Sequence, residues 1–253
     1  MNKKKNILFL LLSLPDLNEN SNIYSDLIQE FDRNGENIFV VAPSVNNEET
    51  RINKEKGLEI LRVRTLPLFG VGTIRKGIAN ILLPYQFYKA IQKYYTSIQF
   101  DTIIIPTPPI TLESLVSKLK NKHKASVYLI LRDIFPQNAV DLGMMKKASL
   151  VYTYFRNHER RLYNISDHIG CMSLGNVDYI VNHNIGINSK KLHVLMNFQK
   201  VLPKDRTLKS DLKNKYGLDG KFVVVFGGNL GVPQKMENVI SFAQVIEKKY
   251  SDV

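Results

Sequence analysis

The sequence predicts an α/β protein with a Rossmann-like, doubly wound parallel sheet, and three observations support this prediction. Short β-type runs alternate with helical patterns along the chain. The β runs are continuously apolar, as expected of strands that are covered on both faces. With 253 residues, of which 44% are hydrophobic, the chain is long enough to bury a substantial core.

The first element, 7–12, is predicted as a buried strand. Its basic start and apolar run also resemble a signal peptide, but the run is short, and Pro15 and Asp16 follow without a cleavage pattern of small residues. A helix is predicted at 23–33, because Asn34-Gly35 suits a left-handed helix end. Further strands are predicted at 38–42, 58–63, 102–105, 127–131, 168–172 and 192–195, with a polar loop before 58–63. Further helices are predicted at 74–96, interrupted at Pro84, and at 111–122, 150–163 and 177–181.

A second unit begins near the C-terminus. The stretch before Phe222 is polar and charged, and "FVVVFGGNLG" then starts a new strand, glycine turn and helix. We therefore predict a nearly complete α/β domain at 1–200, a linker with a short helix at 201–221, and the first strand and helix of a second domain at 222–253.

Composition narrows the classes of partner. The formal net charge of +12 favours an anionic partner: nucleic acid, an anionic membrane or a phosphorylated substrate. The single cysteine, Cys171, allows no intramolecular disulfide, and its apolar neighbours predict a buried core thiol in a cytoplasmic protein. The five histidines form no metal-binding pattern, so we expect no metal site and no cofactor. No stretch approaches the roughly 20 apolar residues that span a bilayer.

Ligands of an open α/β sheet bind beyond the carboxyl ends of its strands. This rule selects the loops "SLPDLNENSN", "PTPPIT", "RDIFPQNAVDLG" and "GGNLG". Arg132 and Asp133 directly follow strand 127–131, and Pro136 fixes the turn behind them. Asp133 is a candidate general base or a group that orients a substrate hydroxyl. The alternative is an aspartate that pairs with Arg132 or caps a turn.

The "GGNLG" loop between a strand and a helix suits a diphosphate, because glycines let backbone N–H groups approach the phosphates. The alternative is a turn that serves packing only. "FGVGTIR" at 69–75 lacks the third glycine of a dinucleotide-binding loop and is interpreted as an ordinary turn.

The stretch 66–100 interleaves cations with large apolar side chains. It contains Arg75, Lys76, Lys89 and Lys93 and no acidic residue. This pattern suits the interface of an anionic membrane, and the alternative is a helix whose apolar face packs on the sheet. Nucleic acid is disfavoured, because the remaining positive charge is scattered and no recognised binding module occurs.

Five segments together resemble a known family: "PTPPIT", "LRDIFPQNAVDLGMM", "HERRLYNISDHIGCMS", "KKLHVLMNF" and "FVVVFGGNLGVPQKMENVISFA". The chain resembles family-four retaining glycosyltransferases of the GT-B fold. It is most similar to the bacterial branch that adds amino-deoxy sugars, of the N-acetylfucosamine type, during O-antigen or capsule synthesis. The resemblance covers all 253 residues in consistent order.

The resemblance implies two Rossmann-like domains that face each other across a cleft, the first binding the acceptor and the second the nucleotide sugar. Residues 1–200 then form the acceptor-binding domain, and 222–253 begin a donor-binding domain that is incomplete, so the chain alone is expected to be inactive. The implied catalytic residue is Asp133. The implied substrate-binding residues are Asn20, Ser21, Arg132, Asn138, Gly228, Asn229, Gly231, Gln234 and Lys235.

Two departures from the family pattern affect the predicted site. Many relatives place an Arg and a Lys after the first strand of the second domain, where they neutralise the departing diphosphate. Asn229 and Gln234 stand at these positions, which fits the amino-deoxy branch and leaves Lys235 as the candidate cation. The first loop has Asn20-Ser21-Asn22 where many relatives have two glycines.

The leading hypothesis is a glycosyltransferase that moves a sugar from a UDP- or GDP-linked donor to a lipid-linked glycan acceptor in surface polysaccharide synthesis. The expected location is the cytoplasm, at the inner face of the plasma membrane. The alternative is a non-catalytic, acceptor-binding and membrane-docking half of a split glycosyltransferase. A nucleotide-sugar epimerase or dehydrogenase is disfavoured, because "PDLNENSN" follows the first strand where those enzymes carry G-x-G-x-x-G.

Overall fold

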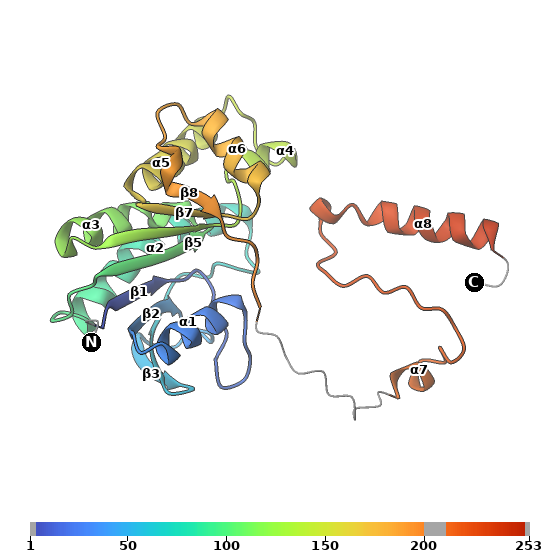
Figure 1. The fold of residues 1–253 in the computed structure, drawn as a ribbon, viewed down its shortest axis with the longest axis horizontal. Helices are drawn as coiled ribbons and strands as arrows, with labels where there is room; N and C mark the ends of the chain where they lie inside the picture. Colours follow the sequence, from blue (N-terminus) through green and yellow to red (C-terminus); the bar gives the residue numbers. More distant parts are fainter. Residues whose placement is uncertain (1–3, 200–210, 251–253) are drawn as a thin grey trace. The chain divides into compact units, whose positions relative to one another are not determined.

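The computed structural model describes residues 4–199 and 211–250, and the chain divides into two units, 1–200 and 201–253. The first unit is built on an eight-stranded sheet with the order β3-β4-β2-β1-β5-β6-β7-β8 (Figure 1). Its strands are β1 (Asn6–Leu10), β2 (Asn37–Pro43), β3 (Arg51–Glu55), β4 (Leu58–Val63), β5 (Thr102–Thr107), β6 (Ser126–Leu131), β7 (His168–Cys171) and β8 (Leu192–Val194). Neighbouring strands are parallel except for the β3–β4 pair.

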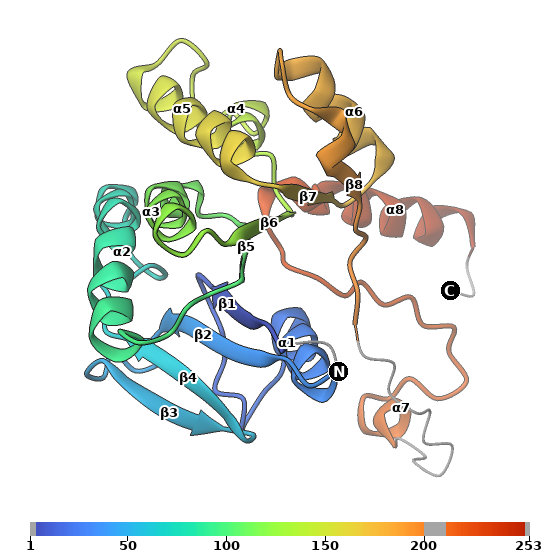
Figure 2. The ribbon, with the colours of Figure 1, turned by 60° about the vertical axis from the view of Figure 1, so that its left-hand side comes forward.

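Helices cover both faces of this sheet, which confirms the predicted doubly wound architecture. They are α1 (Ile23–Arg33), α2 (Thr73–Tyr94), η1 (Ile110–Leu112), α3 (Glu113–His123), α4 (Gln137–Asp141), α5 (Leu150–Ile165), α6 (Leu174–His183) and η2 (Ser189–Lys191). Along β1, Leu8 and Leu10 join one core with α2 and α3, while Phe9 points into a second core with α1. Figure 2 shows α1 on one face of the sheet and α2 and α3 on the other.

The polar segment before β4 contains a strand where the sequence predicts only a loop. β3 pairs antiparallel with β4 through a tight turn at Lys56-Gly57, where both residues have positive φ. The sequence "RINKE" was not predicted as a strand because it is polar, but an edge strand tolerates polar side chains on its open side. Glu55 points inward and is 2% exposed, because it pairs with Arg62 in β4.

Helix α2 continues through Pro84, so the predicted interruption is wrong. A proline inside a helix frees the carbonyl four residues earlier, which here belongs to Asn80. The hydroxyl of Thr111 in η1 donates to this carbonyl at 2.8 Å. The proline is accommodated because a neighbouring element satisfies the acceptor that it leaves. Residues 110–112 form a short 3₁₀ turn ahead of α3, where a helix beginning at 111 was predicted.

The remaining elements of the first unit agree with the sequence apart from the short helix α4 and the 3₁₀ turn η2, neither of which was predicted. Cys171 is fully buried, as predicted, and burial raises the pKa of its thiol to about 11. Among the described residues, no helix combines the length and the apolar character needed to cross a membrane.

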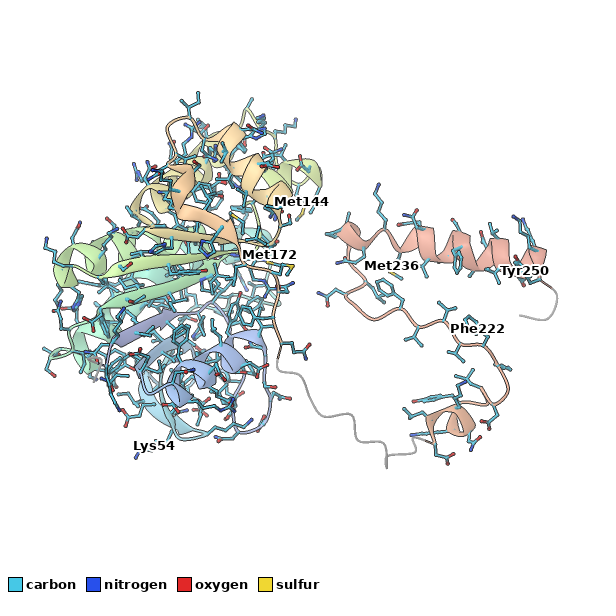
Figure 3. The ribbon with its side chains drawn as sticks, viewed as in Figure 1. Lys54, Met144, Met172, Phe222, Met236 and Tyr250 are labelled. Carbon is cyan, nitrogen blue, oxygen red and sulfur yellow. The ribbon has the colours of Figure 1, made fainter. Side chains whose placement is uncertain are left out.

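In the second unit, residues 211–250 contain α7 (Leu212–Lys215), η3 (Val232–Gln234) and α8 (Met236–Lys249). The predicted helix after the glycines is present, but the predicted strand at Phe222 is wrong (Figure 3). Phe222 is 84% exposed, and no residue of 211–250 is buried. A strand requires a neighbour for its N–H and C=O groups, and the described part of this unit offers none. The first part of the predicted linker, 201–210, lies outside the described residues.

Candidate functional site

A cavity of about 430 Å³ opens at the carboxyl edge of the first unit, where the sequence places the site. Four neighbouring strands, β1, β5, β6 and β7, deliver residues to it, and the start of α1 closes one side. Its lining consists of Leu12, Ser13, Tyr24, Pro106, Thr107, Pro108, Arg132, Asp133, Met172 and Asn197. Met172 marks this edge in Figure 3. The cavity therefore contains both residues that were singled out after strand β6, Arg132 and Asp133.

Arg132 supplies a cation that is held by an aromatic side chain. Its backbone N–H donates to the Thr107 hydroxyl at 3.3 Å, and its guanidinium donates to the Tyr24 hydroxyl at 3.4 Å. The guanidinium carbon lies 5.8 Å from the centre of the Tyr24 ring, within reach of a cation–π interaction. Within 4–199 and 211–250, no carboxylate forms an ion pair with Arg132. Its charge is therefore available to an anionic or hydroxyl-rich ligand.

Asp133 presents an exposed carboxylate to the same cavity. In the described parts of the chain this carboxylate makes neither an ion pair with Arg132 nor a capping bond to a backbone N–H. The Asp133 carbonyl accepts a bond from the Thr107 hydroxyl at 3.5 Å, which fixes the backbone but leaves the side chain free. The geometry thus favours a carboxylate that meets a ligand over one that serves a turn.

Tyr24 is the site residue that the sequence analysis missed. Burial raises the pKa of its phenol; Arg132 lowers this pKa and Asp133 raises it, and the net shift is upward. The phenol therefore stays protonated and keeps a donor in the cavity. Asn22 caps α1 through bonds from the N–H groups of Tyr24 and Ser25 at 2.9 and 3.0 Å, and this cap sets Tyr24 in the first turn. An aromatic residue two positions after an Asn cap, at the carboxyl edge, was the available signal.

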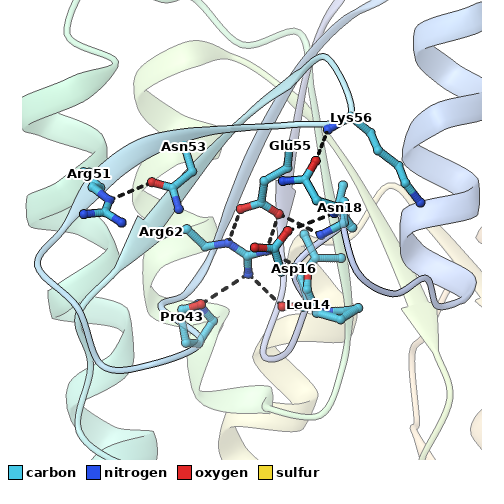
Figure 4. A network of polar contacts seen from close by, with 11 residues as sticks. Leu14, Asp16, Asn18, Pro43, Arg51, Asn53, Glu55, Lys56 and Arg62 are labelled. Carbon is cyan, nitrogen blue, oxygen red and sulfur yellow. Dashed lines mark hydrogen bonds and ion pairs between the residues drawn. The ribbon is translucent and has the colours of Figure 1, made fainter.

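A buried ion pair holds the loop between β1 and α1 in place (Figure 4). Arg62 pairs with Glu55 at 2.6 Å and donates to the carbonyls of Leu14 and Pro15, each at 2.7 Å. Glu55 also accepts the N–H of Leu17 at 3.0 Å. Because this loop supplies Ser13 to the cavity lining, the pair supports the shape of the site, although neither Glu55 nor Arg62 lines it.

Other predicted contacts of the first unit lie outside this cavity. Asn20 and Ser21 are exposed in the loop and do not line it. Asn138 lies in α4, and its buried side-chain oxygen has no hydrogen-bond partner among the described residues. No cluster of three or more His, Cys, Asp or Glu able to hold a metal occurs in the described residues.

The glycine loop of the second unit differs from the predicted geometry. Gly231 precedes the 3₁₀ turn η3, and Lys235 adopts a left-handed conformation with φ 44° immediately before α8. The glycines therefore do not lead directly into the helix N-terminus, as a diphosphate cradle would require. Gly228, Asn229, Gln234 and Lys235 are all exposed.

The first unit is a Rossmann-like, doubly wound α/β domain with a cavity at the carboxyl edge of its sheet. No family model matches the chain. It is 23% identical over 218 residues to the probable glycosyltransferase WbjE of Pseudomonas aeruginosa, covering 85% of this chain and 50% of WbjE. The chain thus spans about half the length of the curated relative that it matches.

Solved structures show the same fold at low identity. Sucrose-phosphate synthase from Thermosynechococcus elongatus matches 96% of this chain and 60% of its own, with a TM-score of 0.70 and 10% identity. Anabaena Alr3699/HepE, in complex with UDP and glucose, matches 95% of this chain and 57% of its own, with a TM-score of 0.57 and 14% identity. Arabidopsis thaliana UGT89C1, complexed with UDP-L-rhamnose, matches 99% of this chain and 63% of its own, with the same TM-score and identity.

Proposed function

We propose that this chain is the acceptor-binding part of a retaining glycosyltransferase that moves a sugar from a UDP- or GDP-linked donor to a lipid-linked glycan. The observation that carries this proposal is the cavity in which Arg132, Asp133 and Tyr24 meet at the carboxyl edge of a GT-B type sheet. The likeness to WbjE, and the nucleotide and sugar ligands of HepE and UGT89C1, support it.

The three polar side chains have distinct proposed roles. Asp133 accepts a hydrogen bond from the attacking hydroxyl of the acceptor and orients it. Arg132 and the Tyr24 hydroxyl donate to other oxygens of the acceptor sugar. In the transfer, the bond from the sugar anomeric carbon to the diphosphate breaks and a bond to the acceptor oxygen forms on the same face. The departing diphosphate takes the proton of the acceptor hydroxyl.

We further propose that the protein belongs to family four and to its amino-deoxy-sugar branch, with a role in O-antigen or capsule synthesis at a membrane surface. The support is the run Asn229 to Lys235, in which Asn229 and Gln234 replace the usual cations, together with the WbjE match.

The test uses a chimera that joins residues 1–221 to the second domain of a complete GT-B glycosyltransferase. The chimera is incubated with UDP- and GDP-sugars and a bacterial lipid-linked glycan extract, and mass spectrometry follows the addition of one sugar. Asp133→Asn should lower turnover by roughly 10²–10⁴-fold, the range for a lost positioning or acid–base group, while donor affinity stays nearly unchanged. Near-normal turnover of this variant would refute the role of Asp133. No transfer by the parent chimera from any donor would count against the proposed function.

The alternative, a non-catalytic half that requires a partner chain, has one observation in its favour. Residues 211–250 contain no sheet that could hold a nucleotide. We therefore expect the 253-residue chain alone to show no turnover, and isothermal titration with uridine and guanosine diphosphates to give at most weak binding. Micromolar affinity for either nucleotide would contradict this expectation.

A further inference from the structure

Helix α2 is apolar on both of its faces. Its inner face buries Ala79, Leu83, Phe87 and Ile91 against the sheet. Its outer face exposes five large apolar side chains: Ile74 81%, Ile78 48%, Ile81 52%, Leu82 40% and Tyr85 56%. These positions recur every three or four residues, so they form one stripe along the helix. We call these five residues the α2 stripe.

Cations border the stripe on its own helix and on the neighbouring helix α3. Arg75 and Lys93 flank it, and Lys89 lies in line with it, with its amine 4.7 Å from the centre of the Tyr85 ring. Lys118 of α3 adds a further amine beside α2, 5.2 Å from the centre of the Tyr88 ring. The segment 66–100 has no acidic residue, and among the described residues no carboxylate pairs with any of these four cations.

The apolar α2 stripe and its bordering amines together indicate one kind of binding partner. An apolar stripe bordered by amines matches a bilayer surface, where side chains enter the boundary of the acyl chains and the amines meet anionic headgroups. An acidic protein partner would match the amines but would leave the large aliphatic side chains without that boundary. We propose that the α2 stripe, with Arg75, Lys89 and Lys93, docks this protein on an anionic membrane.

The position of the stripe links the membrane to the candidate site. Pro108 lines the cavity, and three residues later Thr111 bonds to the α2 backbone at Asn80, between stripe residues Ile78 and Ile81. A docked α2 would therefore hold the cavity edge near the bilayer. This step rests on the proposed function, since it gives a lipid-linked acceptor a short path to Asp133.

The experiment is co-sedimentation of the full chain with vesicles of phosphatidylglycerol and phosphatidylcholine, and with pure phosphatidylcholine vesicles, at low and high salt. We expect binding to the anionic vesicles that weakens at high salt, because screening shortens the reach of the cations. Arg75→Gln, Lys89→Gln and Lys93→Gln combined should lower partitioning by roughly 100-fold, since each cation near the surface contributes about fivefold. Ile78→Ser, Ile81→Ser and Tyr85→Ser combined should also abolish stable binding.

A matched control removes the same charge elsewhere: Lys190→Gln, Lys221→Gln and Lys248→Gln, all at exposed positions. It should retain near-parental binding, and circular dichroism should show that all variants keep the parental fold. The proposal is overturned if the chain binds no vesicle, if it binds neutral and anionic vesicles equally, or if the control loses as much binding as the stripe variants. The proposal is also overturned if the parental chain binds no vesicle but self-associates in analytical ultracentrifugation, and if the serine variant abolishes this self-association.

This test uses no sugar nucleotide, so its failure is distinct from a failure of the proposed transferase. In detergent solution, the chimera with the three glutamines should transfer sugar at the parental rate, because none of these positions lines the cavity.

Discussion

Two stretches of this chain have the same local character and different structures. "ILFLL" in the first unit and "FVVVF" in the second are both short β-type runs followed by a loop and a helix. The first lies mostly in the buried strand β1, between β2 and β5, whereas the second forms no strand in the described residues. The difference shows that a run of residues with high β propensity forms a strand only where a neighbouring strand can pair with its backbone.

The largest expected difference between the two runs is in stability. Phe9 is fully buried and packs edge-on against Phe31, with ring centres 5.9 Å apart, whereas Phe222 is 84% exposed. Phe9→Ala should cost about 3–5 kcal/mol of unfolding free energy, because it leaves a cavity. Phe222→Ala should change it by no more than about 0.5 kcal/mol. Urea unfolding followed by far-ultraviolet circular dichroism measures both. Comparable losses from the two substitutions would show that Phe222 packs in a core.

A second expected difference concerns buried charge, which the first unit contains and residues 211–250 do not. Arg62→Met leaves the Glu55 carboxylate buried without its partner, and this should cost about 3 kcal/mol or more of unfolding free energy. Arg51→Met is the matched control, because the Arg51–Glu48 pair has side chains 57% and 43% exposed. It should cost less than about 1 kcal/mol in the same urea titration. Equal costs would mean that the Glu55–Arg62 pair does not anchor the β1–α1 loop.

The double variant Arg62→Met with Glu55→Leu should recover only part of the unfolding free energy that Arg62→Met alone loses. The double variant removes the unpaired carboxylate, but it leaves the Leu14 and Pro15 carbonyls without the donor that Arg62 supplies. Full recovery would assign the whole effect to the ion pair and none to the loop carbonyls.

The sequence predicts most of the first unit, because its parallel strands are apolar on both faces and their signal is local. It fails where long-range contacts decide. Polar β3 pairs with β4 along its whole length and buries Glu55 against Arg62. Helix α2 continues through Pro84, and Thr111 donates to the carbonyl that this proline leaves without a donor. Phe222 shows the opposite case, in which a strong local signal lacks a neighbouring strand.

The residues of the candidate site also include some that the sequence predicts and some that it does not. The topology rule places Arg132 and Asp133 at the carboxyl edge, since both directly follow a predicted strand. Tyr24 was missed because its place depends on the Asn22 cap and on the turn of α1 toward Arg132, 108 residues away in the chain. The loop residues Asn20 and Ser21 were chosen from the family pattern, and they lie outside the cavity.

The smallest expected effect concerns a half-exposed ion pair of the first unit, which has no counterpart in residues 211–250. Lys120 contacts both oxygens of the Asp167 carboxylate, at 2.8 and 2.7 Å, and the Val127 N–H donates to it at 2.8 Å. Burial alone would raise the pKa of Asp167, but these bonds outweigh burial and lower it. A carboxyl whose pKa is lowered by folding stabilises the protein above its unfolded pKa of about 3.9, and this contribution is lost as the pH falls through the folded pKa.

Asp167→Asn should therefore destabilise the first unit at pH 7 by less than about 1 kcal/mol, because the carboxylate is 41% exposed and solvent screens the pair. The difference from the parental chain should shrink as the pH is lowered below about 4, because the parental carboxylate then also loses its charge. Urea titrations at pH 7, and at several values below about 4.5, measure this trend. Asp178→Asn, at an exposed position of α6, is the control for removal of a surface carboxylate, and at pH 7 it should change the unfolding free energy by no more than about 0.5 kcal/mol. If the difference in unfolding free energy between Asp167→Asn and the parental chain stays constant over this pH range, the carboxylate stabilises the fold through its hydrogen bonds, independently of its charge.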